Sequence, residues 1–218
     1  MTAALSTARM NRIYRRQRHI YDATRKYFLL GRDHVIERLD AAPSHRVLEI
    51  GCGTGRNLIQ AARRYPGAQF FGIDVSTEML TSAIEAIAHA GLAPRVKIAH
   101  ADAAAFDPQR LFGIDRFDRI FISYSLSMIP QWTAVIDQAI AKLASDGELH
   151  IVDFGGQSDL PVLFRNLLRR WLAIFEVTPR DRMELALNAR AHGANAILLI
   201  ERLYRDYAQY ARLRMRRI

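Results

Sequence analysis

The sequence predicts an α/β protein with a doubly wound, mostly parallel sheet of seven strands. Between residues 41 and 160, short apolar runs alternate with stretches of helical periodicity. A glycine-rich turn follows the first of these runs, and two further apolar runs near the end of the chain form a predicted antiparallel hairpin. Alternation of this kind builds βαβ units, whose ligands bind at the carboxyl ends of the strands.

Length and composition indicate one well-buried domain with an appendage. The chain has 218 residues, 50% of them hydrophobic. We assign residues 41–218 to the domain and residues 1–40 to a basic, amphipathic helical extension. A single cysteine, Cys52, excludes a disulfide framework and a cysteine zinc site, and we expect no metal site. The sequence shows no secretory signal and no run long enough to span a bilayer, so we expect a cytoplasmic location.

Each element of the central region has its own signal. The first strand is a short apolar run that ends in glycines, and Pro66-Gly67 stops the helix that follows it. Ser76 caps the second helix, which ends near Gly91. We predict strands at 46–50, 69–74, 96–100, 119–123 and 148–153, and helices at 57–65, 76–89 and 133–143.

The two ends of the chain depart from this alternation. Residues 161–192 read as one or two helices, and residues 196–213 read as two strands around a turn near Tyr204–Asp206. Residues 10–38 read as a helix with aliphatic and aromatic residues on one face and basic residues elsewhere. This helix either lies on a membrane or closes over the domain as a lid, and the sequence leaves both interpretations open.

Charge is segregated along the chain. Residues 41–160 carry 10 basic and 13 acidic side chains, residues 1–40 carry 9 and 4, and residues 161–218 carry 12 and 5. All the positive excess of the +9 net charge therefore lies in the flanks. This segregation favours an anionic partner, either a membrane surface or a nucleic acid.

The glycine turn differs from a dinucleotide-binding fingerprint. Gly51, Gly53 and Gly55 give the spacing G-x-G-x-G, and Arg56 stands where the fingerprint needs its last glycine. Glu49, two residues before the first glycine, would repel a pyrophosphate and favour a positively charged ligand.

Two further acids follow the next two strands. Asp74 ends the second strand, where a carboxylate can accept hydrogen bonds from ribose hydroxyls. Asp102 follows the third strand, where it can face the exocyclic amine of adenine. A ligand that has a sulfonium, an ammonium, a ribose and an adenine, but no phosphate, suits all three acids. That ligand is S-adenosylmethionine.

The motifs E-I-G-C-G-T-G, F-G-I-D-V-S and A-H-A-D-A, with the Gly147-Glu148 turn, resemble the Rossmann-like class I S-adenosylmethionine-dependent methyltransferases. The resemblance covers about residues 46–154 and implies S-adenosylhomocysteine as a product. It places methyl delivery after the fourth strand, at Ser123 and Tyr124. The residues assigned to the cofactor are Tyr27, Glu49, Gly51, Gly53, Gly55, Asn57, Asp74, Val75, Met79, Asp102, Ala103 and Ser123.

A second resemblance concerns the methyl acceptor. The head I-Y-R-R-Q-R-H-I-Y-D-A-T-R-K-Y-F-L-L-G-R-D, with F-I-S-Y-S-L-S-M-I-P and H-I-V-D-F-G, is similar to the bacterial N-methyltransferases of betaine-lipid synthesis. Those enzymes methylate diacylglyceryl-homoserine three times. The resemblance implies a lipid substrate at an anionic membrane surface, a peripheral position on the inner face of the membrane, and the enzyme that makes diacylglyceryl-homoserine as a candidate partner.

Five residues are assigned to catalysis and acceptor binding. Tyr21-Asp22 is similar to a Tyr-Asp pair of quinone methyltransferases, and Tyr21 and Tyr124 are the candidate catalytic tyrosines. Asp153 either orients the amine or has a structural role. Arg25 is expected to hold the acceptor's carboxylate, and Tyr204 its quaternary ammonium.

Four other functions compete with this one. They are phosphatidylethanolamine N-methylation, quinone C-methylation, RNA methylation and a non-catalytic membrane-binding module. An RNA enzyme that methylates a base amine is expected to carry N-P-P-Y after the fourth strand, where this chain has S-Y-S-L, so nucleic acid is not the expected partner.

Overall fold

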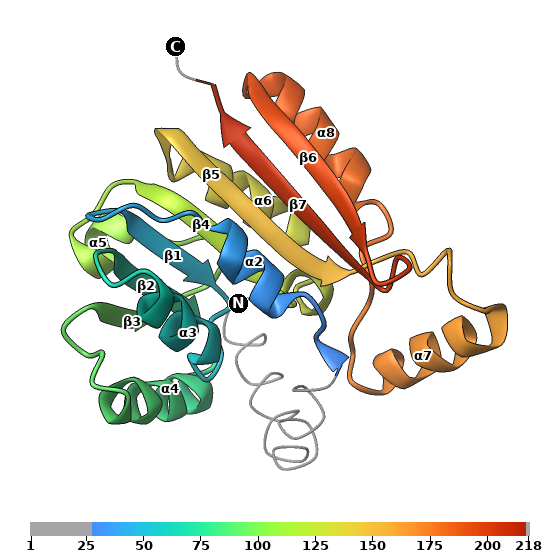
Figure 1. The fold of residues 1–218 in the computed structure, drawn as a ribbon, viewed down its shortest axis with the longest axis horizontal. Helices are drawn as coiled ribbons and strands as arrows, with labels where there is room; N and C mark the ends of the chain where they lie inside the picture. Colours follow the sequence, from blue (N-terminus) through green and yellow to red (C-terminus); the bar gives the residue numbers. More distant parts are fainter. Residues whose placement is uncertain (1–27, 217–218) are drawn as a thin grey trace.

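The computed structural model describes residues 28–216, built around a sheet in the order β3-β2-β1-β4-β5-β7-β6 (Figure 1). The strands are β1 (Arg46–Ile50), β2 (Gln69–Asp74), β3 (Val96–His100), β4 (Phe117–Ser123), β5 (Leu143–Phe154), β6 (Ala196–Leu203) and β7 (Ala208–Met215). The helices are α2 (Arg32–Arg38), α3 (Arg56–Arg64), α4 (Thr77–His89), α5 (Pro108–Phe112), α6 (Trp132–Ala141), α7 (Val162–Ile174) and α8 (Met183–Gly193), with a 3-10 turn, η1 (Leu126–Met128).

Strand pairing confirms the predicted fold class. The strands β1 to β5 pair in parallel, and the order reverses at β1, which lies between β2 and β4. The last strand, β7, is antiparallel to both β5 and β6. The sheet is therefore doubly wound and mostly parallel, with an antiparallel hairpin at its C-terminal edge.

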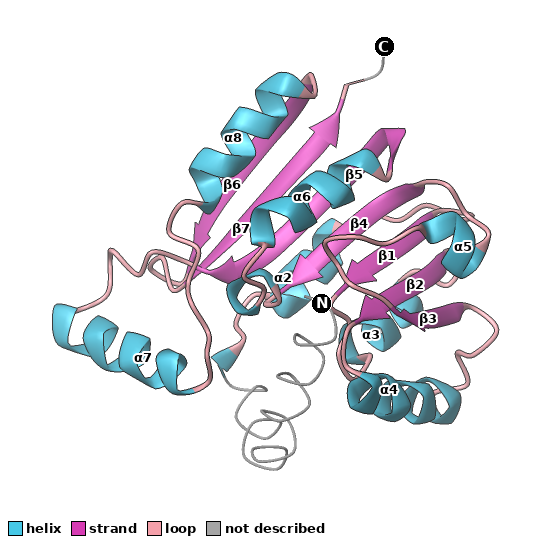
Figure 2. Ribbon diagram, turned by 180° about the vertical axis from the view of Figure 1, so that it is seen from behind, coloured by secondary structure: helices cyan, strands magenta, loops and turns pink. Residues whose placement is uncertain are grey.

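Helices cover both faces of the sheet. Figure 1 shows α2, α3 and α4 in front of the sheet, and Figure 2 shows α6 and α8 on the other side. Side chains alternate between these layers along a strand, so Val47 joins the core on the α2 and α3 side while Leu48 joins the opposite core. Glu49 follows this alternation and shares its face with Val47.

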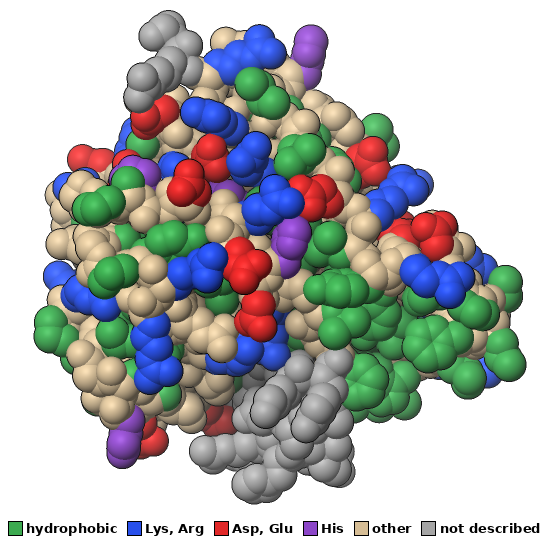
Figure 3. Space-filling view, viewed as in Figure 1, with side chains coloured by type: hydrophobic (Ala, Val, Ile, Leu, Met, Phe, Trp, Pro, Cys, Tyr) green, Lys and Arg blue, Asp and Glu red, His purple; other side chains and the backbone are tan. Residues whose placement is uncertain are grey.

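Some element boundaries differ from the prediction. The strand β5 begins at Leu143 rather than at residue 148, and its pairing with β4 shifts register between Phe117 and Arg119. The helix α5 was not predicted because five residues are too few to show a helical period. Asp107 caps it, accepting a hydrogen bond from Gln109 N at 3.0 Å. The predicted helices of residues 161–192 correspond to α7 and α8, and hydrophobic side chains gather on the surface over α7 (Figure 3).

The prediction of one helix over residues 10–38 is wrong at its C-terminal end. Leu29 to Gly31 are not helical, and Gly31 has a φ of 87°, in the left-handed region where glycine is favoured. A new helix, α2, begins after it. Residues 10–27 of the predicted helix lie outside the described residues.

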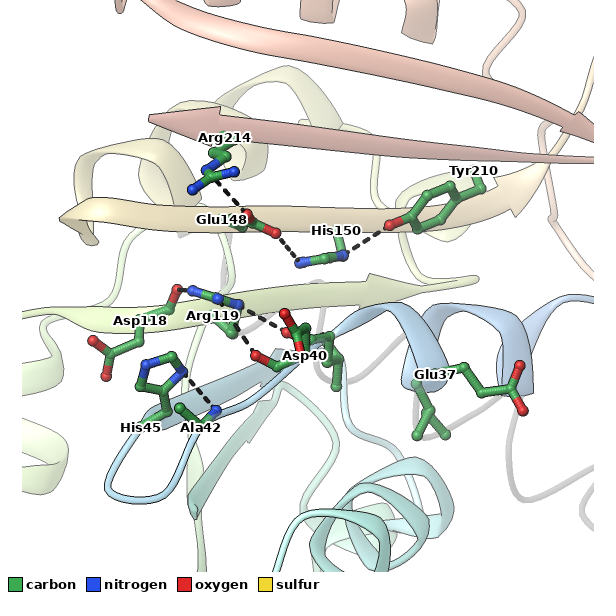
Figure 4. Close-up of polar contacts among 12 residues, drawn as sticks. Glu37, Asp40, Ala42, His45, Asp118, Arg119, Glu148, His150, Tyr210 and Arg214 are labelled. Carbon is green, nitrogen blue, oxygen red and sulfur yellow. Dashed lines mark hydrogen bonds and ion pairs between the residues drawn. The ribbon is translucent and has the colours of Figure 1, made fainter. Parts of the chain in front are cut away.

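The segment after Gly31 is attached firmly to the sheet. Val35 and Leu39 are fully buried. Arg119 on β4 donates from Nε to the carbonyl of Leu39 at 2.8 Å and from Nη2 to that of Asp40 at 3.4 Å (Figure 4). Residues 32–40, which the sequence placed in an extension, thus pack into the core of the domain.

A buried polar cluster joins β5 to β7 (Figure 4). Glu148 lies 3.2 Å from His150 Nε2 and 3.4 Å from Arg214 Nε, and the hydroxyl of Tyr210 lies 2.9 Å from His150 Nδ1. Burial lowers the pKa of His150 and keeps the ring neutral. Burial alone would raise the pKa of Glu148, but the hydrogen bond from His150 and nearby arginines hold it below its usual value. The cluster therefore pairs a neutral imidazole with an ionised carboxylate.

Candidate active site

The glycine loop connects β1 to α3. Gly51, Gly53 and Gly55 all have positive φ values, of 75°, 52° and 77°. The backbone N–H groups of Gly51 and Cys52 both donate to the carbonyl of Ile73, at 2.8 and 3.0 Å, which holds the loop against the end of β2. Only residues without a side-chain penalty at positive φ follow this path at low cost, which explains the G-x-G-x-G spacing.

Asp74 fastens the other side of the loop. Its Oδ2 accepts a hydrogen bond from Gly53 N at 2.8 Å, and its Oδ1 accepts one from Ser76 N at 2.9 Å. Ser76 in turn caps α4 by accepting from Met79 N at 3.3 Å. Each carboxylate oxygen has a second lone pair, so Asp74 can still accept hydrogen bonds from a ligand.

A cavity of about 270 Å³ lies over the carboxyl ends of the parallel strands. Two carboxylates, Asp74 and Asp102, stand among mostly apolar walls. The predicted residues that line it are Gly51, Gly53, Asp74, Val75, Met79, Asp102, Ala103 and Tyr124. The others are Ile73, Ala101, Ala104, Ala105, Ser125, Met128, Ile129 and Gln131. A flat apolar slot with carboxylates for a ribose and an exocyclic amine fits the adenosine part of S-adenosylmethionine.

A larger cavity, of about 630 Å³, opens on the α2 and α3 side of the loop. It shares Gly51 and Gly53 with the smaller one, so the two meet at the glycine loop. Glu49, Asn57 and Ser123 line it, as do Leu29, Arg32, Cys52, Thr54, Arg56, Ile59, Gln60, Arg63, Ser82 and Ala86.

Polar groups in the larger cavity are arranged for a ligand. Glu49 is buried and accepts a hydrogen bond from Asn57 Nδ2 at 2.8 Å. The buried hydroxyl of Ser123 has no hydrogen-bond partner among the described residues. A buried carboxylate and an unsatisfied hydroxyl next to the glycine loop fit a ligand that has a positive charge and hydrogen-bonding groups.

Two residues near the loop have structural roles. Gly55 lines neither cavity among the described residues, and it caps α3 where an added Cβ would lie 3.3 Å from Ala83 Cβ. Cys52 is buried, and burial, followed by the charges of Asp74 and Glu49, raises the pKa of its thiol well above the usual value. This thiol is therefore unreactive at neutral pH.

Tyr124 connects the cavity to the N-terminal segment. It has a φ of 56°, and its hydroxyl donates a hydrogen bond to the carbonyl of Leu30. Its ring packs edge-on against Phe154 at 4.8 Å. Burial, followed by the charge of Asp153, raises the pKa of this hydroxyl well above its usual value, so it stays protonated.

Asp153 does not border either cavity. It is fully buried, accepting from Ser127 N at 3.0 Å and from Phe154 N at 2.8 Å. Burial raises its pKa to about 6 against these hydrogen bonds. Of the two roles that the sequence left open, this position favours the structural one, in which Asp153 holds η1 beneath the cavity.

The remaining predicted residues are separate from the cavities or outside the described chain. Tyr204 lies in the turn between β6 and β7 and is exposed. Tyr21, Arg25 and Tyr27 precede residue 28. Within the described residues, no group of three His, Cys, Asp or Glu side chains is placed to hold a metal ion. None of the helices described between residues 28 and 216 is long and apolar enough to cross a bilayer.

The sequence missed the residues that follow β4. Ser125, Met128, Ile129 and Gln131 line the smaller cavity, and of these Met128 belongs to η1. The rule that ligands bind at the carboxyl ends of parallel strands, applied beyond Tyr124, would have indicated this loop.

Comparison with known proteins defines the class. Residues 42–189 match a family described as "Methyltransferase domain", and the chain belongs to this family. Together with the strand order and the loop, this makes it a class I S-adenosylmethionine-dependent methyltransferase.

Several individual proteins are similar to it. Methyltransferase GfsG of Streptomyces halstedii is 33% identical over 121 residues, which cover 56% of this chain and 42% of GfsG. A trans-aconitate 2-methyltransferase of Paracidovorax citrulli is 32% identical over 117 residues, which cover 54% of this chain and 42% of that protein. A phosphatidylethanolamine N-methyltransferase of Cereibacter sphaeroides is 31% identical over 133 residues, covering 61% of each chain. The match thus spans 42% to 61% of these relatives, less than two thirds of each.

One solved structure illustrates the shared fold. The structure of Haemonchus contortus phosphoethanolamine N-methyltransferase 2 in complex with S-adenosyl-L-methionine has a TM-score of 0.66 and 18% identity. The match covers 86% of this chain and 52% of that protein. At this identity the likeness concerns the fold alone.

Proposed function

We propose that this protein transfers methyl groups from S-adenosylmethionine to the amine of a membrane-lipid head group. The proposed acceptor is diacylglyceryl-homoserine, which three successive transfers would convert to a betaine lipid. The enzyme would work from the cytoplasmic side, on the inner face of the membrane. The observation that carries this proposal is the set of charged side chains at the site. Three carboxylates, Glu49, Asp74 and Asp102, and three arginines, Arg32, Arg56 and Arg63, border the cavities, whereas no His or Lys does so among the described residues.

This charge distribution favours an amine acceptor. A phenol or carbon acceptor must lose a proton to a base, and since neither cavity has an imidazole or a lysine among the described residues, that base would have to be a carboxylate. An amine attacks through the lone pair of its neutral form and can give its proton to water, so it needs no dedicated base. A buried carboxylate such as Glu49 also stabilises the ammonium that each transfer produces.

In this proposal the residues of the chain bind the cofactor and the acceptor and align them for methyl transfer. The bound cofactor supplies a methyl group on a sulfonium, and Asp74 and Asp102 fix its ribose and adenine ends. Asn57 holds Glu49 in place, and the free hydroxyl of Ser123 is available to hydrogen-bond a ligand at the end of β4. Catalysis then comes mainly from proximity and alignment rather than from proton transfer. Each of the first two transfers leaves an ammonium, which gives its proton to water and regains its lone pair before the next transfer. The third leaves a quaternary nitrogen with neither a proton nor a lone pair, and repeated transfer stops there.

The acidic part of the head group also has candidate partners. Arg32 and Arg63 line the larger cavity, where a guanidinium can hold a carboxylate bidentately. Arg25, outside the described residues, is still the partner that the sequence predicts.

Phosphatidylethanolamine is a second candidate acceptor. The enzyme from Cereibacter sphaeroides is named for this substrate, and it matches equal shares of both chains. A phosphate would then occupy the place of the homoserine carboxylate next to the arginines.

The test is methylation of defined vesicles by the whole purified chain. The protein receives methyl-labelled S-adenosylmethionine and vesicles that contain diacylglyceryl-homoserine, phosphatidylethanolamine or neither lipid. We expect label in diacylglyceryl-homoserine, with up to three methyl groups counted by mass spectrometry. The variant Asp102→Ala should lose this activity, and Asp107→Ala, a capping carboxylate outside both cavities, should retain it.

Other outcomes identify a different acceptor. Label only in phosphatidylethanolamine would select the second candidate. Label in a quinone, in RNA, or in a base-labile ester of a small acid such as trans-aconitate would reject lipid N-methylation. Cofactor binding without transfer to any of these would reject it as well.

A further inference from the structure

The helix α7 exposes an apolar stripe that the domain does not cover. Leu163, Leu167 and Ile174 have exposed fractions of 75%, 57% and 68%. Their spacing places them on one face of the helix. Leu168 and Leu172 are buried on another face, which attaches α7 to the core. Single exposed leucines are common, but Val162 and Phe164 are also exposed, so most of the apolar residues of the first turns face outward.

Aromatic side chains border this stripe. Trp171 packs against Phe28 at 4.7 Å and against Phe175 at 4.9 Å between ring centroids. The space-filling view shows a continuous hydrophobic surface over α7, at the lower right (Figure 3). Tryptophan and phenylalanine next to aliphatic residues are typical of helices that lie in a membrane interface.

The charges on α7 complement an anionic surface. The helix contains Arg165, Arg169 and Arg170 and no acidic residue. Arg169 is bound to Asp181 at 2.8 Å. Arg170 is exposed, lies on the same face of the helix as the stripe, and has no side-chain hydrogen bond or ion pair within the part of the chain that the structure describes, so it is available to lipid phosphates.

The stripe lies at the edge of the sheet where the cavities open. Leu168 and Leu172 belong to the same core cluster as Tyr124, which lines the smaller cavity. The hydroxyl of Tyr207 donates to the carbonyl of Phe28 at 2.9 Å, and that of Tyr124 donates to the carbonyl of Leu30. Figure 1 shows α7 beside the turn between β6 and β7, beyond the carboxyl end of β5. A surface that contacts α7 would therefore be linked to Tyr124 of the smaller cavity through Trp171 and residues 28–30.

We propose that α7 docks on an anionic lipid bilayer and inserts Leu163, Leu167 and Ile174 into the boundary between head groups and acyl chains. This inference rests on the proposed function, since it explains how a lipid acceptor reaches the cavity. A second copy of the chain fits less well. A helix of 13 residues is about 20 Å long and 10 Å wide, so one face offers roughly 200 Å². Stable complexes bury about 800 Å² per partner.

Vesicle co-sedimentation of the full chain, without S-adenosylmethionine, tests the docking surface. The vesicles contain phosphatidylglycerol and phosphatidylcholine. We expect the double variant Leu163→Gln/Leu167→Gln to partition into vesicles at least tenfold less than the wild type. The matched control is Leu185→Gln/Ile197→Gln, which changes two exposed residues on α8 and β6 and should bind as the wild type. Equal partitioning of both double variants and the wild type would overturn the proposal.

A local probe separates α7 from any other membrane contact. In Trp132→Phe, the remaining tryptophan is Trp171, and brominated lipids should quench its fluorescence on vesicle binding. In Trp171→Phe, which retains Trp132, we expect no quenching. Sedimentation without quenching of Trp171 would show that another surface binds the membrane and would reject α7. A wild type that is dimeric where the α7 double variant is monomeric would assign the stripe to a second copy.

The two proposals can fail separately. Vesicle binding through α7 with no methylation of any lipid would support the proposed docking surface and reject the proposed acceptor. Methylation of a lipid without quenching of Trp171 would keep the acceptor and reject the docking surface.

Discussion

Replacement of Gly51 by alanine should destabilise the fold in two ways, through backbone strain and through steric overlap. Gly51 has a φ of 75°, and an added Cβ would lie 2.6 Å from Ser125 Cβ and 2.7 Å from its Oγ. The left-handed backbone costs about 1–2 kcal/mol for alanine. The overlap with Ser125 adds about 1–3 kcal/mol, as for overpacked cores. Gly91 is the matched control, because it has a φ of 69° and nothing within 4 Å of an added Cβ.

We therefore expect Gly91→Ala to lower the free energy of unfolding only by the cost of placing alanine in a left-handed backbone conformation. Gly51→Ala should lose about 1–3 kcal/mol more. For a chain of this size, each kcal/mol lowers Tm by about 2–4 °C. Adding Ser125→Gly to Gly51→Ala should recover the stability that is lost to the steric overlap, because it removes Cβ and Oγ of Ser125.

Thermal denaturation and calorimetric titration with S-adenosylmethionine measure the two consequences. The cofactor should bind weakly or not at all to Gly51→Ala and normally to Gly91→Ala, because Gly51 lines both cavities and Gly91 lines neither. Equal stability of the two variants, or undiminished cofactor binding by Gly51→Ala, would refute this account of the loop.

Three further predictions concern single side chains. Asp102→Ala should weaken cofactor affinity in calorimetry about 10- to 100-fold, which corresponds to the loss of a hydrogen bond to a charged group. Asp107→Ala should leave the affinity unchanged. Equal losses of affinity in the two variants would contradict the assignment of Asp102 to adenine. Tyr124→Phe removes the hydrogen bond to Leu30 and should lower the turnover rate more than the cofactor affinity, so unchanged turnover would exclude a catalytic or positioning role. Asp153, with a folded pKa of about 6 against an ordinary 3.8, contributes stability that is fully present below pH 4 and lost as pH rises through 6. Relative to Asp153→Asn, the wild type should lose roughly 3 kcal/mol between pH 4 and 7 in denaturant titrations, and parallel pH profiles would contradict the burial argument.

The periodicity of the sequence was sufficient to predict the sheet and many of the residues that line the two cavities. Apolar runs identified the strands, and the residues that follow them identified Asp74, Asp102 and the glycine loop, because parallel strands end at one edge. Periodicity alone did not decide which carboxylates face a cavity. Glu49 shares the face of Val47 and lines the larger cavity, whereas Asp153 ends its own strand but is enclosed by the backbone of η1.

Contacts between distant parts of the chain were beyond sequence reasoning. Arg119 binds the carbonyl of Leu39 across 80 positions, and this bond attaches the end of the predicted extension to the sheet. The cavity wall formed by η1 depends on Asp153, which is buried beneath it. Helical periodicity also continued through Leu29–Gly31, where the chain is not helical and Gly31 has a positive φ.

Tyr124 shows why the two cavities and the N-terminal segment should respond to ligand together. It is a non-glycine residue with a φ of 56°, a conformation that costs about 1–3 kcal/mol and persists only where its surroundings enforce it. Tyr124 directly follows β4 and lines the smaller cavity, while its hydroxyl donates to the carbonyl of Leu30, next to Leu29 of the larger one. The same segment reaches α7 through Phe28 and Trp171. A ligand that orders the loop after β4 thus acts directly on the segment that joins the active site to the proposed lipid-binding surface.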